Sequence, residues 1–397
     1  MTTDLLDHLL LGAGTVFDAQ RRPAASRLTL HPLSAEPADP ARLLHSLAQA
    51  WPDTLGPLWL NPTSEGWLDA LLGVDLPPHL LLEVPAFLAG DPAWAGRWTQ
   101  GAMPQATRVL KGRPLAPLAP EVMAAFSQAI VERSDDRRVA EPGPRTSARA
   151  MPFVQSGNQD LAEVGDSFRR GALGVLGWPL GDAPDAGTRR KDVPPGVSVV
   201  MDLIQLVERE EPAAKLEVVL RRDPGIAYRL MRFINSPGFG LSVEINSFQH
   251  ALMVLGYQRL KRWLALLLTS AIDNPDLKPM MFLAVRRGLL MEELVRAQGD
   301  DSLRNEVFIC GLFSLLDRML GQPFQHLLES LPVPERVGLA LVQGDGPHRP
   351  LLDLAVAVEM ESPFDIREAC EVLMIAPGDL NRAVLASLRS AWQMRVD

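Results

Sequence analysis

The chain has few of the residues that build disulfide frameworks, metal clusters or membrane spans. Its 397 residues include two cysteines, Cys310 and Cys370, both in apolar, helix-like contexts. Two cysteines make neither a disulfide framework nor a thiolate cluster, so we expect each to pack as a small buried hydrophobe. No window of about 18 residues is uncharged and apolar, which excludes a typical transmembrane helix. Asp4 and Asp7 stand where a secretory signal would be basic, so we predict a cytoplasmic protein.

Lysine is also scarce, and acidic side chains outnumber basic ones. Five of the 39 basic residues are lysines, and the formal net charge is −9. The phosphate field of a nucleic acid or an anionic membrane repels such a chain as a whole. Short arginine runs at residues 221–222 and 286–287 lie in helix-like segments, and we interpret them as solvated faces or local ion pairs. We therefore expect neither a nucleic-acid partner nor a membrane partner.

Common catalytic motifs are missing as well. The sequence has no Walker A motif, no Gly-x-Ser-x-Gly and no His-Glu-x-x-His, and none of its seven histidines precedes an aspartate. Gly12 and Gly14 begin a Gly-x-Gly pattern, but Phe17 replaces the third glycine, which favours a turn before a strand over a dinucleotide site. His250 lies beside an apolar helix face and is interpreted as a packing residue. The sequence thus predicts no catalytic residue, no resident metal and no cofactor.

The chain is longer than one hydrophobic core usually serves, so we expect two domains. Residues 183–196 are rich in Pro, Gly and charged residues and are predicted to link a domain at 1–182 to a domain at 197–397. In the first domain, short apolar runs alternate with helix-like stretches, which favours a parallel α/β architecture. The runs are residues 58–60, 80–82, 108–110 and 173–176, and the helix-like stretches include 41–50 and 120–132.

Beyond the linker, nearly every segment has a helical period, so the second domain is predicted to be all-helical. Asp365 and Glu368 form a capping box that is expected to open one of its last helices. Between residues 218 and 270, an Asp-Pro pair opens one apolar helix, an Asn-Ser-Pro step ends it, and a glycine ends the next. These boundary residues are Asp223, Pro224, Asn235, Ser236, Pro237 and Gly256. None of them offers catalytic chemistry, which favours an interaction module.

This order of helix signals resembles the HDOD domain, the HD-related output domain of bacterial signalling proteins, over about residues 194–390. Residues 306–321 are similar to a later helix of the same family. HDOD domains descend from the HD phosphohydrolase fold, whose Gly-Leu-x-His-Asp pattern aligns with this helix. Ser314 and Leu315 occupy the places of the His and the Asp, so the resemblance implies that the metal-binding pair is absent.

Residues 311–317 of this helix, Gly-Leu-Phe-Ser-Leu-Leu-Asp, are similar to the corresponding sequence of HDOD domains that follow a degenerate EAL domain. The strand and helix order of the first domain also resembles an EAL domain, a TIM-type barrel whose active members cleave cyclic di-GMP at divalent metals. Asn61 and Glu83 match metal-binding positions of that family. The namesake Glu-x-Leu strand falls at residues 26–31 without a carboxylate, the paired Asp-Asp has no counterpart, and Leu176 replaces a Gln. Residues 90–150 depart most from the pattern, so a complete and an incomplete barrel both remain open.

Together the two resemblances imply a degenerate EAL-like TIM-type barrel followed by an all-helical HDOD domain. They imply a non-enzymatic signal-transduction protein that acts through protein partners and is linked to cyclic di-GMP signalling. Two alternatives stay open: a cyclic di-GMP receptor that does not hydrolyse its ligand, and a residual metal-dependent phosphohydrolase. The sequence identifies neither the partner nor whether the chain associates with itself.

Overall fold

The computed structural model describes residues 5–34, 39–100, 107–114, 116–136, 151–185, 187, 194–220, 222–223, 226, 248–270, 274–329 and 331–394. The chain forms two compact units. The barrel unit comprises Met1–Pro179 and Val356–Trp392, and the helical unit comprises Leu180–Ala355 and Gln393–Asp397. None of the described helices combines the length and the apolar character that crossing a bilayer requires.

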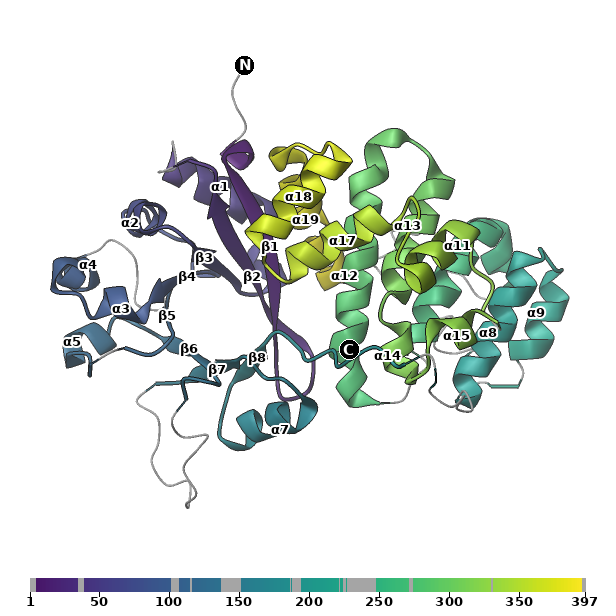
Figure 1. Cartoon of the computed structure of the whole chain (residues 1–397), viewed down its shortest axis with the longest axis horizontal. Helices are drawn as coiled ribbons and strands as arrows, with labels where there is room; N and C mark the ends of the chain where they lie inside the picture. Colours follow the sequence, from purple (N-terminus) through teal and green to yellow (C-terminus); the bar gives the residue numbers. More distant parts are fainter. Residues whose placement is uncertain are drawn as a thin grey trace. The chain divides into compact units, whose positions relative to one another are not determined.

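Eight strands close into a barrel in the order of the sequence (Figure 1). Strand β1 is antiparallel to both of its neighbours, β2 and β8, and all other neighbours are parallel. The sheet is therefore mixed, whereas the sequence predicted a parallel one. Because the strands close on themselves, the alternative of an incomplete barrel is wrong. The strands are β1 Leu9–Phe17, β2 Pro23–Pro32, β3 Leu58–Pro62, β4 Leu80–Pro85, β5 Arg108–Lys111, β6 Gln128–Glu132, β7 Phe153–Ser156 and β8 Gly174–Leu176.

One layer of the barrel interior is apolar. Every strand contributes to it, because side chains alternate between the two faces of a strand. Its members are Val16, Ala25, Trp59, Leu81, Val109, Ile130 and Val154, with Leu176 packed against them. The apolar runs read from the sequence therefore lie where barrel strands were expected, in β3, β4, β5 and β8.

Two expectations for the barrel are wrong. Residues 120–132 are not one helix, because the short α5, Pro120–Met123, is followed by strand β6. The β-branched Ile130 and Val131 favour a strand, and Ile130 belongs to the interior layer. Gly12 and Gly14 lie inside β1 and not in a turn before it. The other helices that follow strands are α1 Pro40–Ala50, α2 Glu65–Leu72, α3 Ala86–Ala89, α4 Ala95–Gln100 and α7 Leu161–Arg169.

In the helical unit, every regular element among the described residues is a helix. Its elements are α8 Pro195–Glu208, α9 Ala213–Leu220, α11 Phe248–Ser270, α12 Lys278–Val295, α13 Asp301–Phe313, α14 Leu316–Leu320, α15 Phe324–Leu328 and α16 Glu335–Gly338. Helix α8 thus begins inside the expected linker. Helices α12 and α13 approach closely at two glycines, since a Cβ on Gly311 would lie 2.6 Å from the Cα of Gly288.

The last helices belong to the barrel unit. Helix α17, Arg349–Glu359, runs from one unit into the other, and α18, Pro363–Leu373, and α19, Pro377–Gln393, follow it. The second domain was expected to continue to residue 397, whereas Val356–Trp392 lies with the barrel. Helix α18 also starts earlier than the expected box at Asp365, because Ser362 is its N-cap and Pro363 its first residue.

An asparagine explains why the chain returns to the barrel. Strand β8 pairs with β1 only at Val16 and Phe17, so it leaves the first part of β1 without a second strand neighbour. Asn381 of α19 supplies the missing hydrogen bonds: its Oδ1 accepts from the N–H of Leu11 at 3.0 Å. Its Nδ2 donates to the carbonyls of Leu6 and Leu9 at 2.7 and 2.8 Å. The buried amide of Asn381 therefore binds backbone groups at an edge of β1 that has no strand partner.

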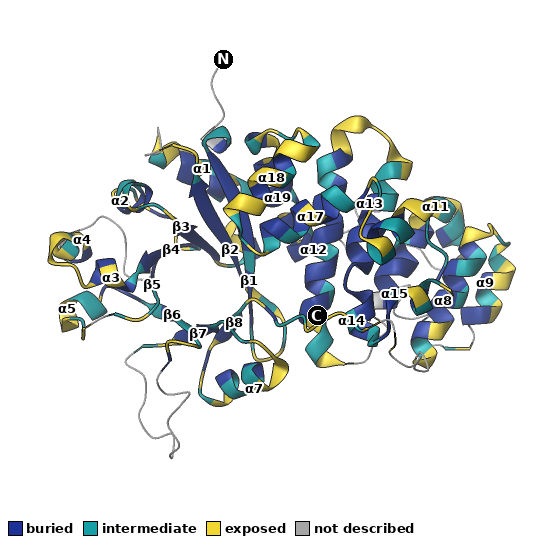
Figure 2. Cartoon of the chain, in the orientation of Figure 1, coloured by how far each residue is buried: buried dark blue, intermediate teal, exposed yellow. Residues whose placement is uncertain are grey.

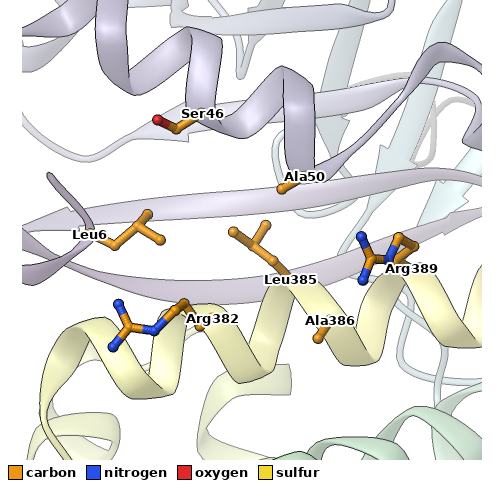
Figure 3. A pocket seen from close by; sticks show the side chains of 7 residues that line it. All are labelled: Leu6, Ser46, Ala50, Arg382, Leu385, Ala386 and Arg389. Atoms are coloured by element: carbon orange, nitrogen blue, oxygen red, sulfur yellow. The ribbon is translucent and has the colours of Figure 1, made fainter. Parts of the chain in front are cut away.

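The far end of α19 is fixed by Trp392. Its indole N–H donates to the hydroxyl of Ser26 at 2.6 Å, and its ring meets that of Trp51 edge-on, with centroids 5.5 Å apart. Between these two anchors, α19, α1 and Leu6 line a half-open pocket of about 170 Å³ with mainly apolar walls (Figure 3). Arg382 and Arg389 of α19 border this pocket.

We expect the substitution Asn381→Ala to lower the free energy of unfolding by about 3 kcal/mol, because buried backbone groups lose their partners. Ser387→Ala is the matched control on the same helix. Ser387 is also buried, but its hydroxyl bonds only to the carbonyl of Val384 in its own helix. Urea denaturation measures both variants. Equal losses in the two variants would contradict the role assigned to Asn381.

Candidate functional site

Polar side chains form a second layer inside the barrel, next to the apolar one. They come two residues after interior apolar positions, and so face the same way. Four of them form two hydrogen-bonded pairs: Arg27 of β2 with Glu83 of β4, and Lys111 of β5 with Asn61 of β3. Because these strands are parallel, their carboxyl ends open at one mouth of the barrel, where barrel enzymes carry their active sites.

Arg27 and Glu83 form a buried, two-pronged ion pair. The Nε and Nη2 atoms of Arg27 donate to the two carboxylate oxygens of Glu83 at 2.7 and 2.8 Å. The remaining Nη1 donates to Oε2 of Glu361 at 2.5 Å. Burial by itself lowers the pKa of Arg27, but the two carboxylates outweigh it and raise that pKa above its usual value. Arg27 is therefore a permanent cation held between two acids.

Lys111 binds Asn61, the second residue that matches a metal-binding position of the EAL family. Its Nζ donates to Oδ1 of Asn61 at 2.9 Å, and Nδ2 of Asn61 donates to the hydroxyl of Thr29 at 3.0 Å. Burial lowers the pKa of Lys111, Arg27 lowers it further, and Glu83 opposes both. The amide oxygen that a metal would need is thus bound to an ammonium group.

The fourth charged side chain of the site, Glu361, lies in the turn between α17 and α18. The backbone N–H groups of Glu361 and Ser362 bond to the carbonyls of Val358 and Ala357, both at 3.2 Å, which is the Schellman pattern of a helix end. Glu361 has φ 55°, in the left-handed region that usually takes glycine. A side chain there costs about 1 kcal/mol.

Contacts in the barrel offset that cost. The carbonyl of Glu361 lies 3.0 Å from Nε2 of His31, and its carboxylate binds Arg27. Burial lowers the pKa of His31, so the neutral ring donates its Nε2–H to this carbonyl. Gly12 and Gly14 leave room for the turn, because a Cβ on Gly12 would lie 2.8 Å from the Cα of Glu361 and one on Gly14 2.6 Å from its Oε1.

This arrangement does not fit a divalent metal ion. Magnesium and its relatives need several carboxylate, carbonyl or water oxygens. Both carboxylate oxygens of Glu83 and the amide oxygen of Asn61 instead accept hydrogen bonds from Arg27 and Lys111. In the described part of the chain, no three His, Cys, Asp or Glu side chains come together so as to hold a metal. The structure thus unites the two residues matched from the sequence but surrounds them with cations.

The matched positions of the helical unit are packing residues. Ser314 donates its hydroxyl hydrogen to the carbonyl of Gly311 at 2.7 Å and lies 3.2 Å from Nη1 of Arg287, and Leu315 is fully buried. Burial raises the pKa of Asp317, and the backbone N–H of Arg318 opposes this. A hydroxyl and an isobutyl group at these two places supply no pair of metal ligands.

The helix-boundary residues are described only in part. Asp223 accepts a hydrogen bond from the N–H of Ile226 at 3.0 Å, as a helix N-cap does. Gly256 has φ 70° and ψ 170°, and it interrupts α11 where a helix was expected to end. The other four, Pro224, Asn235, Ser236 and Pro237, lie outside the described residues.

Comparison with known proteins supports the assignment of the helical half. Residues 193–321 match the model of the HDOD domain. The chain is 28% identical over 210 residues to the cyclic di-GMP phosphodiesterase CdgJ of Vibrio cholerae, which covers 53% of the chain and 48% of that protein. It is 27% identical over 162 residues to the uncharacterized protein YuxH of Bacillus subtilis, covering 40% and 39%. The chain therefore spans about half or less of the length of these relatives.

Among solved structures, a crystal structure from Shewanella amazonensis SB2B covers 51% of the chain and 94% of its own, with a TM-score of 0.36 and 14% identity. At this level of similarity the match bears on neither the activity nor the site.

We expect Arg27→Met to lower the free energy of unfolding by about 3 to 5 kcal/mol, because it leaves two buried carboxylates without their cation. Arg22→Met, on the same hairpin, is the control. Arg22 is exposed and pairs with Asp18 across one turn, so its loss should cost less than about 1 kcal/mol. Chemical denaturation distinguishes the two. A loss for Arg27→Met no larger than that of the control would refute the central role of this ion pair.

A pH dependence follows from Glu361. Burial raises its pKa above the usual 4.5, Arg27 opposes this and Glu83 reinforces it. The folded state therefore favours the protonated acid, and this contribution to stability is complete below pH 4.5 and lost as the pH rises through the raised pKa. Glutamine does not titrate. The free energy of unfolding of the natural chain minus that of Glu361→Gln should thus fall as the pH rises from about 4 to 8. Urea titrations at several pH values measure this difference, and an increase with pH would contradict the expected sign.

Proposed function

We propose that the chain is a non-enzymatic signal-transduction protein in which a degenerate EAL-like barrel and an HDOD domain act as binding surfaces for other proteins. One observation carries this proposal: the oxygens of Glu83 and Asn61 are bound by the chain's own cations, Arg27 and Lys111. A barrel mouth neutralised in this way has no place for the metal that an EAL-type reaction requires.

The link to cyclic di-GMP signalling rests on the relatives. The HDOD match at residues 193–321 lies within the helical unit, and CdgJ of Vibrio cholerae is named a cyclic di-GMP phosphodiesterase. The EAL-like character of the barrel is supported by its eight strands and by the meeting of Asn61 and Glu83 at one mouth. We infer the same pathway for this chain, without the hydrolytic step, and a cytoplasmic location.

The two other functions need something that the barrel mouth lacks. A phosphohydrolase needs a metal-activated water, whereas the donor set offers a cation in the metal's place. A cyclic di-GMP receptor at this mouth would have to detach Arg27 from Glu83 and Glu361 to bring its charge to a phosphate. The pair with Glu83 is buried and the pair with Glu361 is partly buried, so the exchange would leave carboxylates without a partner. Protein binding requires no such rearrangement.

We expect no turnover of cyclic di-GMP by the purified chain with Mg²⁺ or Mn²⁺, and no calorimetric heat when either ion is titrated in. An active cyclic di-GMP phosphodiesterase serves as the positive control for the assay. Turnover that disappears in Glu83→Ala would overturn the proposal and identify the barrel as the active site. Heat on adding cyclic di-GMP without turnover would instead favour the receptor.

A further inference from the structure

Apolar side chains gather on the outside of α18 and its two ends. Met360, Phe364, Val372 and Met374 are 68%, 74%, 65% and 92% exposed, and much of this helix is coloured as exposed in Figure 2. Single exposed hydrophobic residues are common on protein surfaces. Four within 15 residues of chain are a local concentration of exposed apolar groups, and contiguous apolar surface marks binding sites.

The geometry of α18 places these groups together. Ile366 and Cys370 are its buried residues, and they hold the helix on the barrel unit. Phe364 and Val372 lie eight residues apart on the opposite face, which is a separation of about 12 Å along the helix. Glu368 lies on the same face between them, since residues four apart are neighbours on a helix surface. The outward face therefore alternates apolar and acidic groups.

Met374 gives independent support, because its backbone conformation is costly. Its φ is 54°, and the N–H groups of Met374 and Ile375 bond to the carbonyls of Glu371 and Cys370, as at a Schellman end. Glycine usually takes this place. Met374 is 92% exposed, so packing against the described residues does little to offset the strain. Flexible methionines are favoured on surfaces that receive partner helices.

The charge of the surface indicates the chemistry of the partner. Asp365, Glu368 and Glu371 are exposed along α18, and Arg367 is the basic residue among them, so the helix carries a net charge of −2. Acidic groups around an apolar surface attract basic side chains and repel acidic ones. The same charge disfavours an anionic membrane or a nucleic acid.

We propose that the α18 surface, defined by Met360, Phe364, Glu368, Glu371, Val372 and Met374, binds a basic amphipathic helix of a partner protein. The partner's apolar face covers Phe364 and Val372, and its lysines or arginines pair with Glu368 and Glu371. The two helices would pack through side chains that are spaced about two helical turns apart on each helix. The inference rests on the proposed protein-binding function and gives that function a surface and a partner class.

The test uses the full chain and three labelled helical peptides with leucines at positions i, i+4 and i+7. Their remaining positions are lysine, glutamate or glutamine. Fluorescence anisotropy should show binding of the lysine peptide and at least tenfold weaker binding of the other two. Phe364→Ser, and Glu368→Lys combined with Glu371→Lys, should each weaken binding of the lysine peptide at least tenfold.

Phe87→Ser is the matched control, because Phe87 is 56% exposed on α3 of the same unit. It should leave the affinity unchanged, and thermal unfolding should show that all variants fold. No binding of the lysine peptide, equal binding of the three peptides or an unchanged affinity for Phe364→Ser would each overturn the proposal.

Sedimentation of the unlabelled chain adds one more outcome. A dimer that Phe364→Ser dissociates would make a second copy the occupant and overturn the partner assignment. A monomer at the same concentration supports it. Failure of the α18 surface leaves the proposed function standing, whereas metal-dependent turnover would remove the proposed function whatever the peptides do.

Discussion

The guanidinium of Arg27 is the interaction on which the barrel unit depends. It is buried and holds Glu83 with two hydrogen bonds and Glu361 with a third. Two carboxylates buried so close together repel each other and lose their hydration, so a positive charge has to lie between them. A metal ion can supply that charge and keep positions for water and substrate. An arginine supplies it with fixed N–H donors, and under the proposed function the acids that it holds are structural.

The contact of Arg27 with Glu361 ties a late segment of the chain to the barrel. Glu361 is 334 residues away from Arg27 in sequence, and the chain returns to the barrel to bring the two together. Asn381 and Trp392 fix the same segment to β1 and β2, so three separated contacts hold it in place. The barrel unit is therefore discontinuous, and its stability depends on the presence of its last helices.

Sequence patterns predicted what depends on local periodicity. The apolar runs predicted β3, β4, β5 and β8, and the helical period beyond the linker predicted the helices of the second domain. Asn61 and Glu83 came from the resemblance to the EAL domain and not from a local pattern. Residues 120–132 were mistaken for a helix because a short apolar run fits both periods. Arg27 carried a signal that was missed: it stands two residues after Ala25 on a barrel strand, so it had to point inward. Glycines 12 and 14 also signalled a close approach of another backbone. Nothing local identifies Glu361 as that neighbour, because the contact exists only after the whole chain has folded.

Helices α17 and α18 are each followed by a residue in the same uncommon backbone conformation. Glu361 and Met374 both take the left-handed conformation after a helix, with φ 55° and 54°, where glycine would carry no strain. At Glu361 the side chain turns into the barrel, and the ion pair with Arg27 accounts for the choice of residue. At Met374 the backbone pattern is the same, yet the side chain meets solvent. Phe364 and Val372 are exposed on the helix between these two ends. Under the proposed binding of a partner helix, a contact outside the chain would account for Met374 as Arg27 accounts for Glu361.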